Sequence, residues 1–79
     1  MKTIRHDGYR ELLTELRSAR EMAGTTQAEA GRLIGHSRQW VSKIELSEIR
    51  LDVLQLAQLC QLYGLKAHEL VRRMEEGVP

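Results

Sequence analysis

The chain has 79 residues, 42% of them hydrophobic and only 4% aromatic, and its formal net charge is +1. A chain of this length builds one small domain and has no room for the second layer that enzymes usually need. The single cysteine excludes an intramolecular disulfide and fits a reducing cytosol, and no apolar run approaches the roughly 18 residues of a membrane span. Because proline and β-branched residues are few, we expect a cytoplasmic, all-α domain with an aliphatic core.

Residues 1–8 carry basic side chains without helical periodicity, so we expect a flexible N-terminal arm. Two interpretations of this arm are open: a frayed terminus, or a basic segment that follows a phosphate strand or packs on a second subunit. Helical spacing then predicts a first helix from Tyr9 to Ala23, which Gly24 ends. Its expected core-facing residues are Leu12, Leu13, Leu16, Ala19 and Met22.

Residues 26–45 have the pattern of two short helices joined by a tight turn. Thr26 is expected to cap the first, from Gln27 to Ile34, and Ser37 to cap the second, from Arg38 to Glu45. The apolar positions have the spacing that helix packing requires. The residues expected to face inward are Ala30, Leu33, Ile34, Val41 and Ile44.

Two glycines constrain this pair of helices. Gly31 stands where the first helix would cross the second, and only a very small side chain permits a close crossing. Gly35 can adopt the positive φ that a sharp reversal after a helix requires. The exposed face of the second helix then carries only hydrogen-bonding side chains, with no acid among them: Arg38, Gln39, Ser42 and Lys43. This composition is suited to base edges and phosphates.

Two further helices are predicted after the loop 46–52. Asp52 is expected to cap a helix from Val53 to Tyr63, whose buried side would be Val53, Leu56, Ala57, Leu59 and Cys60. Cys60 has no partner at ligand spacing, so we interpret it as a packing residue. A last helix from Ala67 to Glu76 carries the stripe Leu70, Val71 and Met74. The domain would thus span residues 9–76, with residues 77–79 as a short tail.

The stretch from Thr26 to Glu45 resembles the helix-turn-helix of the Cro and phage-repressor (XRE-like) family of transcription regulators. The residues that carry the resemblance are Gln27, Gly35, Ser37, Arg38 and the run Val41-Ser42-Lys43-Ile44-Glu45. The likeness extends over a five-helix pattern from about Tyr9 to Met74. It implies a compact five-helix, lambda-repressor-like domain with the helix-turn-helix at its second and third helices. The third helix would enter the major groove of DNA.

The resemblance also implies roles for individual residues. Carried over to this chain, the base-reading residues are Arg38, Gln39, Ser42 and Lys43. Gln27 and Ser37, at the starts of the two helices, are expected to hold phosphates. Arg50 either reaches a phosphate or is solvated. The indole of Trp40 either lies against the sugar–phosphate chain, donating its N–H to a phosphate, or packs over the preceding helix.

Three positions outside the two helices also follow from the resemblance. In the family, an arginine at the position of Arg20 pairs with the glutamate that closes the recognition helix, which is Glu45 here; the alternative is a solvated arginine. Ser47 stands where family members usually carry glycine, and Leu51 where many carry proline. Because a serine at positive φ is strained, these departures favour a different path for this loop.

The last two helices carry more large apolar residues than one small core needs. The family commonly dimerises through its C-terminal helices, so the expected seam is Leu65, Leu70, Val71 and Met74. The alternative is that these residues all fit inside the monomer. A two-fold dimer would place two recognition helices about 34 Å apart and would read a palindromic operator.

We therefore expect a sequence-specific regulator of double-stranded DNA, acting as a homodimeric repressor. The alternative is an antitoxin-type module that neutralises a partner protein and binds DNA secondarily; the short tail after the last helix argues against it. An enzyme has little support, because the three histidines are scattered and no nucleophile–base pair or metal spacing occurs. No cofactor or metal is expected.

Overall fold

The computed structural model describes residues 7–76, and residues 1–6 and 77–79 lie outside the described part of the chain. Five helices confirm the predicted all-α fold, and no strand occurs between residues 7 and 76. No helix in this range is long and apolar enough to cross a bilayer. The helices in chain order are α1 (Asp7–Met22), α2 (Gln27–Ile34), α3 (Arg38–Glu45), α4 (Val53–Tyr63) and α5 (Ala67–Glu75).

The helix boundaries differ from the prediction only in α1 and α5. The first helix begins at Asp7, two residues earlier than expected, and ends at Met22; the last ends at Glu75. Asp7 places a carboxylate in the first turn of α1, where the helix dipole favours negative charge. The expected arm therefore loses its last two residues to α1, and its remainder lies outside the described residues.

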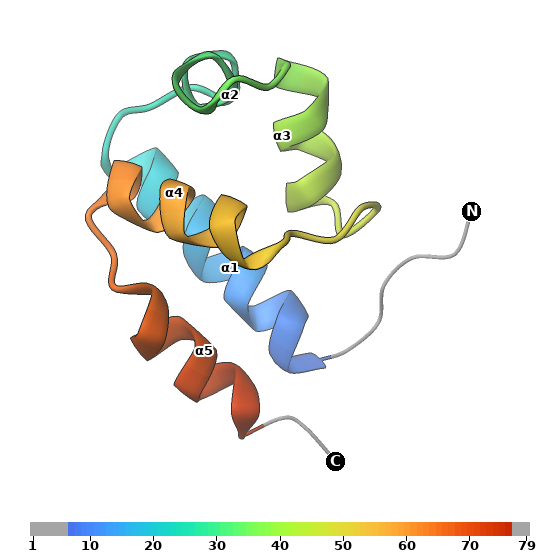
Figure 1. Cartoon of the computed structure of the whole chain (residues 1–79), viewed down its shortest axis with the longest axis vertical. Coiled ribbons are helices and arrows are strands. Elements are labelled where there is room, and N and C mark those ends of the chain that lie inside the picture. The colour runs from blue at the N-terminus through green and yellow to red at the C-terminus, as the bar shows by residue number, and fades with distance from the viewer. Residues whose placement is uncertain (1–6, 77–79) are drawn as a thin grey trace.

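The first helix supports most of the others. It packs against α3, α4 and α5, while α2 packs against α3 and α4. Figure 1 shows α4 crossing in front of α1, with α2 and α3 together at the upper end and α5 beside α1 at the lower end. The helix-turn-helix pair thus forms the end of the molecule opposite α5.

The core is aliphatic and draws on all five helices. Its buried side chains are Leu12, Leu13, Leu16, Ala30, Val41, Ile44, Leu59, Cys60, Tyr63 and Leu70. Cys60 packs in this core, and burial raises the pKa of its thiol. Leu70 was predicted for a dimer seam, and that prediction is wrong, because its side chain is 1% exposed within the single chain. The other seam candidates, Leu65, Val71 and Met74, are half-buried.

Several side chains predicted to face the core are exposed instead: Met22, Leu33, Val53 and Ala57. Met22 and Val53 are terminal residues of α1 and α4, where the helix extends past its contacts with the core. Leu33 lines a shallow, open groove between α2 and α4, with Ile34, Gln58, Gln61 and Leu62 as its other walls. The apolar period therefore predicts the inward face of these helices correctly. The residues at the margins of that face, however, are not covered by another helix within residues 7–76.

The loop between α3 and α4 keeps a left-handed residue without a glycine. Ser47 has a φ of 60° and is buried. The serine adopts the left-handed conformation although its Cβ makes it strained. The expectation of a different loop path is therefore wrong at this residue. Leu51, in the place of the usual proline, donates its N–H to the hydroxyl of Tyr9 at 3.1 Å. A proline could not donate this bond, which ties the loop to α1.

Candidate nucleic-acid interface

Both helices of the helix-turn-helix begin at a side-chain cap. Thr26 accepts the N–H of Glu29, and the Glu29 carboxylate accepts the N–H of Thr26, which completes a capping box. The bond from this N–H lowers the pKa of the Glu29 carboxyl. At α3, the Ser37 hydroxyl accepts the N–H of Trp40 at 3.0 Å. These caps fix where each helix starts, as the sequence predicted.

The turn between the helices is held tightly against α2. Gly35 adopts the left-handed conformation, with φ 80°, and ends α2. The next N–H, of His36, donates to the carbonyl of Gly31 at 2.7 Å. A Cβ on Gly31 would lie 2.7 Å from the His36 carbonyl oxygen and 2.8 Å from that of Ser37, so only glycine fits at this crossing.

The third helix turns one face to the core and the opposite face to solvent. Val41 and Ile44 are each 2% exposed and anchor the inner face. The outer face carries the four residues predicted to read bases, of which Arg38, Gln39 and Lys43 are exposed and Ser42 is half-buried. This outer face, Arg38, Gln39, Ser42 and Lys43, is called the reading face below.

A buried ion pair links α1 to the end of α3. The Arg20 Nε donates to Glu45 Oε2 at 2.7 Å, and its Nη2 donates to Oε1 at 3.2 Å. The two side chains are 10% and 7% exposed. The bond to Glu45 raises the pKa of the Arg20 guanidinium, which therefore stays charged despite its burial. The structure thus contains the pair that the family resemblance implied.

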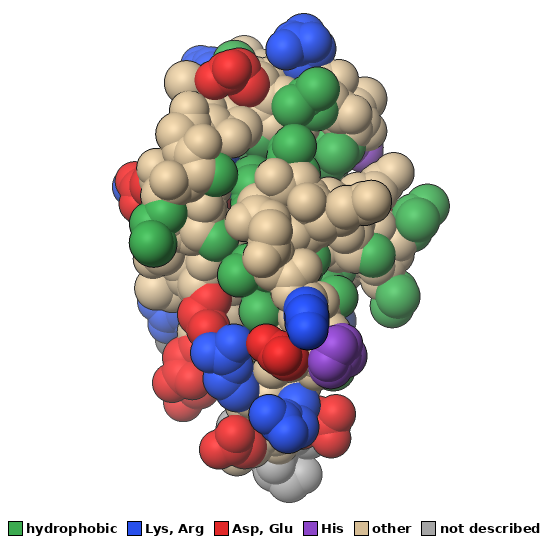
Figure 2. Space-filling model, turned by 90° about the vertical axis from the view of Figure 1, so that its left-hand side faces the viewer, with side chains coloured by type: hydrophobic (Ala, Val, Ile, Leu, Met, Phe, Trp, Pro, Cys, Tyr) green, Lys and Arg blue, Asp and Glu red, His purple; other side chains and the backbone are tan. Residues whose placement is uncertain are grey.

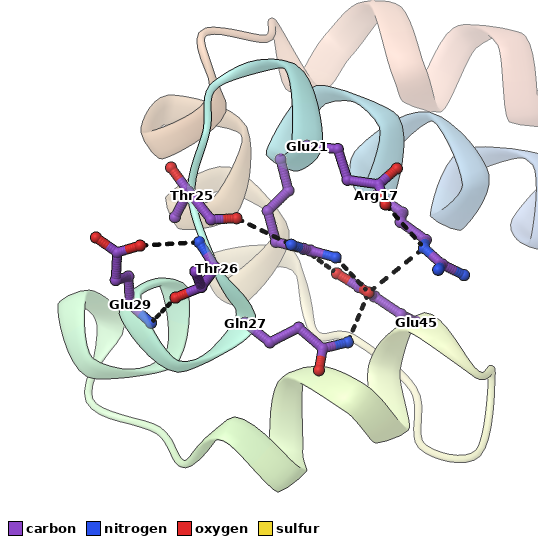
Figure 3. Close-up of polar contacts among 8 residues, drawn as sticks. Arg17, Glu21, Thr25, Thr26, Gln27, Glu29 and Glu45 are labelled. Carbon is purple, nitrogen blue, oxygen red and sulfur yellow. Dashed lines mark hydrogen bonds and ion pairs between the residues drawn. The ribbon is translucent and has the colours of Figure 1, made fainter.

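The same carboxylate also holds α2. The Gln27 side-chain amide donates its N–H to Glu45 Oε1 at 2.9 Å, and Arg20 Nη1 donates to the Thr25 carbonyl at 2.9 Å. Figure 3 shows Gln27 and Arg17 both in contact with the Glu45 carboxylate, from opposite sides of the ion pair with Arg20. These contacts join side chains of α1, α2 and α3. As a result, α1, α2 and α3 are fixed to one another beneath the reading face.

This arrangement changes what Gln27 can offer to DNA. Gln27, at the N-terminus of α2, is predicted from the sequence to hold a phosphate. In the structure, the amide nitrogen is occupied by Glu45. One of the two N–H groups of this amide is therefore engaged inside the protein, and the first turn of α2 offers backbone N–H groups beside it.

The described geometry agrees with two comparisons with known proteins, while comparison with curated proteins gives no match. A family model described as "Helix-turn-helix domain" matches residues 11–74. A solved structure of an "XRE-family like protein" from Pseudomonas syringae pv. tomato str. DC3000 is 36% identical, covering 91% of this chain and 88% of that one, with a TM-score of 0.78. The chain belongs to the XRE-like helix-turn-helix family. It is accordingly a DNA-binding regulator.

Charge distinguishes the two ends of this XRE-like regulator. Figure 2 shows acidic and basic side chains intermixed at the lower end of the molecule, the end where Figure 1 places α5. One such contact there joins Arg73 of α5 to Glu15 of α1. The reading face carries two cations and no acid. The outer face of α3 is therefore a cationic surface without acidic neighbours among its four residues, whereas cations and acids are mixed around α5.

Sequence reasoning missed one contact at the site of this XRE-like regulator. The imidazole of His36 stacks on the indole of Trp40, with ring centroids 3.9 Å apart and an interplanar angle of 15°. His36 lies in the turn before the cap of α3, so helical spacing does not predict this contact, which depends on the path of the turn. Trp40 is half-buried at the edge of the core, and Arg50 is exposed.

Proposed function

We propose that this XRE-like regulator is a sequence-specific repressor that binds double-stranded DNA with α3 in the major groove. The observation that carries the proposal is the reading face, whose four hydrogen-bonding side chains stand outward from a rigid base. Arg20, Gln27 and Glu45 supply that rigidity from beneath. Because the backbone of α3 is fixed, the positions from which these side chains reach the base edges need not be ordered on binding, which favours discrimination between base pairs.

Reading and positioning fall to different residues of this surface. Arg38 and Lys43 suit the two acceptors of guanine in the major groove, and Gln39 suits the acceptor–donor pair of adenine. Ser42, beside them on α3, donates to or accepts from either. Phosphates would be held by Ser37, Arg50 and the N–H groups at the start of α2. The indole of Trp40 would donate to a phosphate beside α3.

We infer that the regulator acts as a homodimer on a palindromic operator, since one short helix reads only a few base pairs. The α5 seam has little support, because Leu70 is buried in the monomer. Leu46, Val53 and Leu54 are 58%, 84% and 66% exposed, and they lie between the end of α3 and the first turn of α4. We call these three residues the α3–α4 patch and propose it as the dimer contact.

Two features favour a second copy of this chain as the occupant of the α3–α4 patch. The loop within it carries Glu48, Arg50 and Asp52, so both signs of charge occur together. In a two-fold contact each sign can face its opposite across the axis, which makes the surface self-complementary. The patch also directly follows Glu45, so a contact there would lie beside the C-terminal end of α3 in each copy. Figure 2 shows hydrophobic side chains standing out at the right edge of the molecule. This edge is the front of the view in Figure 1, where α4 lies.

The proposed function is tested by replacing Lys43 with alanine. A duplex of roughly 20 bp, two helical turns, is first selected from a random library with the wild-type protein. Lys43→Ala should weaken binding to this duplex by about 1–3 kcal/mol, and binding to random DNA by less. The matched control is Lys66→Ala, which removes an exposed lysine at the start of α5 and should leave both affinities unchanged. Equal losses on both duplexes would mean that Lys43 contacts only the backbone, and failure to select any duplex would refute sequence-specific binding.

A further inference from the structure

The stack of His36 on Trp40 connects the turn to one flank of α3. His36 precedes the cap of this helix, and Trp40 is its third residue. Both side chains are half-buried, and their rings lie nearly parallel at 3.9 Å. The imidazole can fix the orientation of the indole only if the backbone of His36 is itself held in place.

The backbone of His36 is held by α2. Its N–H donates to the Gly31 carbonyl at 2.7 Å, the shortest of the bonds across this turn. The close approach of the turn to Gly31 leaves no space for the His36 carbonyl to move toward α2. The imidazole thus stands on a rigid support at the edge of the reading face.

Trp40 is held on two sides before the imidazole is considered. Its backbone N–H donates to the Ser37 hydroxyl, and its side chain packs against the edge of the core. The imidazole covers one face of the indole ring. Because a tryptophan side chain has only two rotatable bonds, the core on one side and the imidazole on the other restrict the orientation of the indole.

The indole N–H remains available to a partner from outside. No residue between 7 and 76 accepts a hydrogen bond from it, and no buried side-chain nitrogen or oxygen in this range lacks a partner, so the indole nitrogen reaches solvent. On α3, Trp40 lies three residues before Lys43 and flanks the reading face. A single outward donor beside a basic face is placed to meet a phosphate of the strand that borders the groove.

We propose that His36 is a positioning residue for DNA binding: by stacking on Trp40, it holds the indole N–H toward a backbone phosphate beside α3. The inference rests on the proposed function, because it requires α3 to lie in the groove. His36 itself need not touch DNA. By orienting the indole in the free protein, His36 lowers the conformational entropy that the Trp40 side chain loses when DNA binds.

The stack is tested first in the free protein. Trp40 is the only tryptophan of the chain, so its fluorescence reports on this site alone. His36→Ala should shift the emission to longer wavelength and raise its quenching by acrylamide, because one face of the indole becomes open to water. His36→Phe, which restores a flat ring, should bring both signals back toward the wild type. His68→Ala is the control, since it removes an exposed histidine on α5 and should change neither.

DNA binding is then measured on the duplex selected with the wild-type protein. His36→Ala should weaken binding by about 2- to 10-fold, the range of an aromatic pair, and His36→Phe should recover most of it. The dependence of affinity on salt should not change, because a neutral indole N–H releases no counterion. Loss of a cationic contact would instead reduce the log–log slope by about 0.9.

A double-mutant cycle decides whether His36 acts through Trp40. Trp40→Phe keeps a ring but removes the N–H, and in that background His36→Ala should cost little more. Additive losses, a reduced salt slope for His36→Ala, or unchanged Trp40 fluorescence would each overturn the positioning role. Selection of no duplex by the wild type would overturn the proposed function and this role together. Selected binding that His36→Ala leaves intact would overturn this role alone.

Discussion

At the residue scale, Arg20 and Glu45 are the charged groups on which the site depends. The guanidinium lies 10% exposed at the junction of three helices, with one carboxylate as its counter-ion and one carbonyl as a further acceptor. Desolvating such a group is costly unless the counter-ion stays in place. The pair is therefore better described as a requirement of this packing than as a source of net stability.

This view predicts that Glu45→Gln is strongly destabilising. The amide keeps the shape of the side chain but leaves the Arg20 charge buried without a counter-ion, so the free energy of unfolding should fall by about 3 kcal/mol. Glu21→Gln is the matched control, because its pair with Arg17 is largely exposed and should contribute less than about 1 kcal/mol. Urea unfolding of both variants checks the prediction. Similar losses in the two variants would show that burial does not distinguish these pairs.

The raised pKa of Tyr63 predicts that the folded protein loses stability at alkaline pH. Burial, and then the nearby Glu45 charge, raise the pKa of its hydroxyl from 10 to about 12 in the folded protein. Between these values the unfolded chain loses the proton while the folded chain keeps it, so stability present below about pH 10 is lost as pH rises toward 12. The loss from this group amounts to roughly 2–3 kcal/mol. In unfolding experiments across this range, Tyr63→Phe should lose less stability than the wild type; parallel curves would contradict the assignment.

At the scale of the element, the loop between α3 and α4 shows a local conflict that the fold overrides. Ser47 adopts a φ of 60° although its Cβ disfavours that region. Its N–H donates to the Ile44 carbonyl, and the N–H of Glu48 donates to that of Lys43, so the end of α3 is satisfied only in this conformation. The hydrogen bonds of the helix end outweigh the strain of one residue.

Comparing two substitutions at Ser47 isolates that strain. Both Ser47→Gly and Ser47→Ala remove the hydroxyl and whatever it contacts, but only glycine relieves the positive φ. The glycine variant should therefore be more stable than the alanine variant by about 1 kcal/mol in thermal or chemical unfolding. Equal stability of the two variants would mean that the loop relaxes to another path once the serine is gone.

Helix positions and the residues on the outer face of α3 were predictable because their signals are local. Caps such as Thr26 and Ser37, the turn glycine Gly35 and the apolar period of α3 all act within a few residues of themselves. The outcome for Leu33 and Val53 was not predictable in this way, since whether an apolar residue finds a partner depends on the other helices. The same holds for the bond between Leu51 and Tyr9, which joins positions 42 apart in sequence. Periodicity gives the face of a helix, but tertiary packing decides how much of it is covered.

At the scale of the whole molecule, the dimer seam illustrates this limit. The large apolar residues of the last two helices suggested a seam on α5, yet Leu70 is buried where α5 packs against α1 and α4. Three of the exposed apolar residues, Leu46, Val53 and Leu54, lie instead between the end of α3 and the first turn of α4. A contact there couples dimerisation to DNA binding directly, since it sets the separation of the two reading faces.

Val53→Glu tests this contact without endangering the fold. Val53 is 84% exposed and is the first residue of α4, where a carboxylate is favoured by the helix dipole. Two such carboxylates close to a two-fold axis repel each other, so sedimentation equilibrium should find the variant monomeric where the wild type is dimeric. Met22→Glu adds the same charge at an 89% exposed position outside the α3–α4 patch and should leave the dimer intact. A wild type that stays monomeric, or a Val53→Glu variant that still dimerises, would exclude the α3–α4 patch. A monomer that still binds a half-site would show that α3 reads DNA independently of this contact.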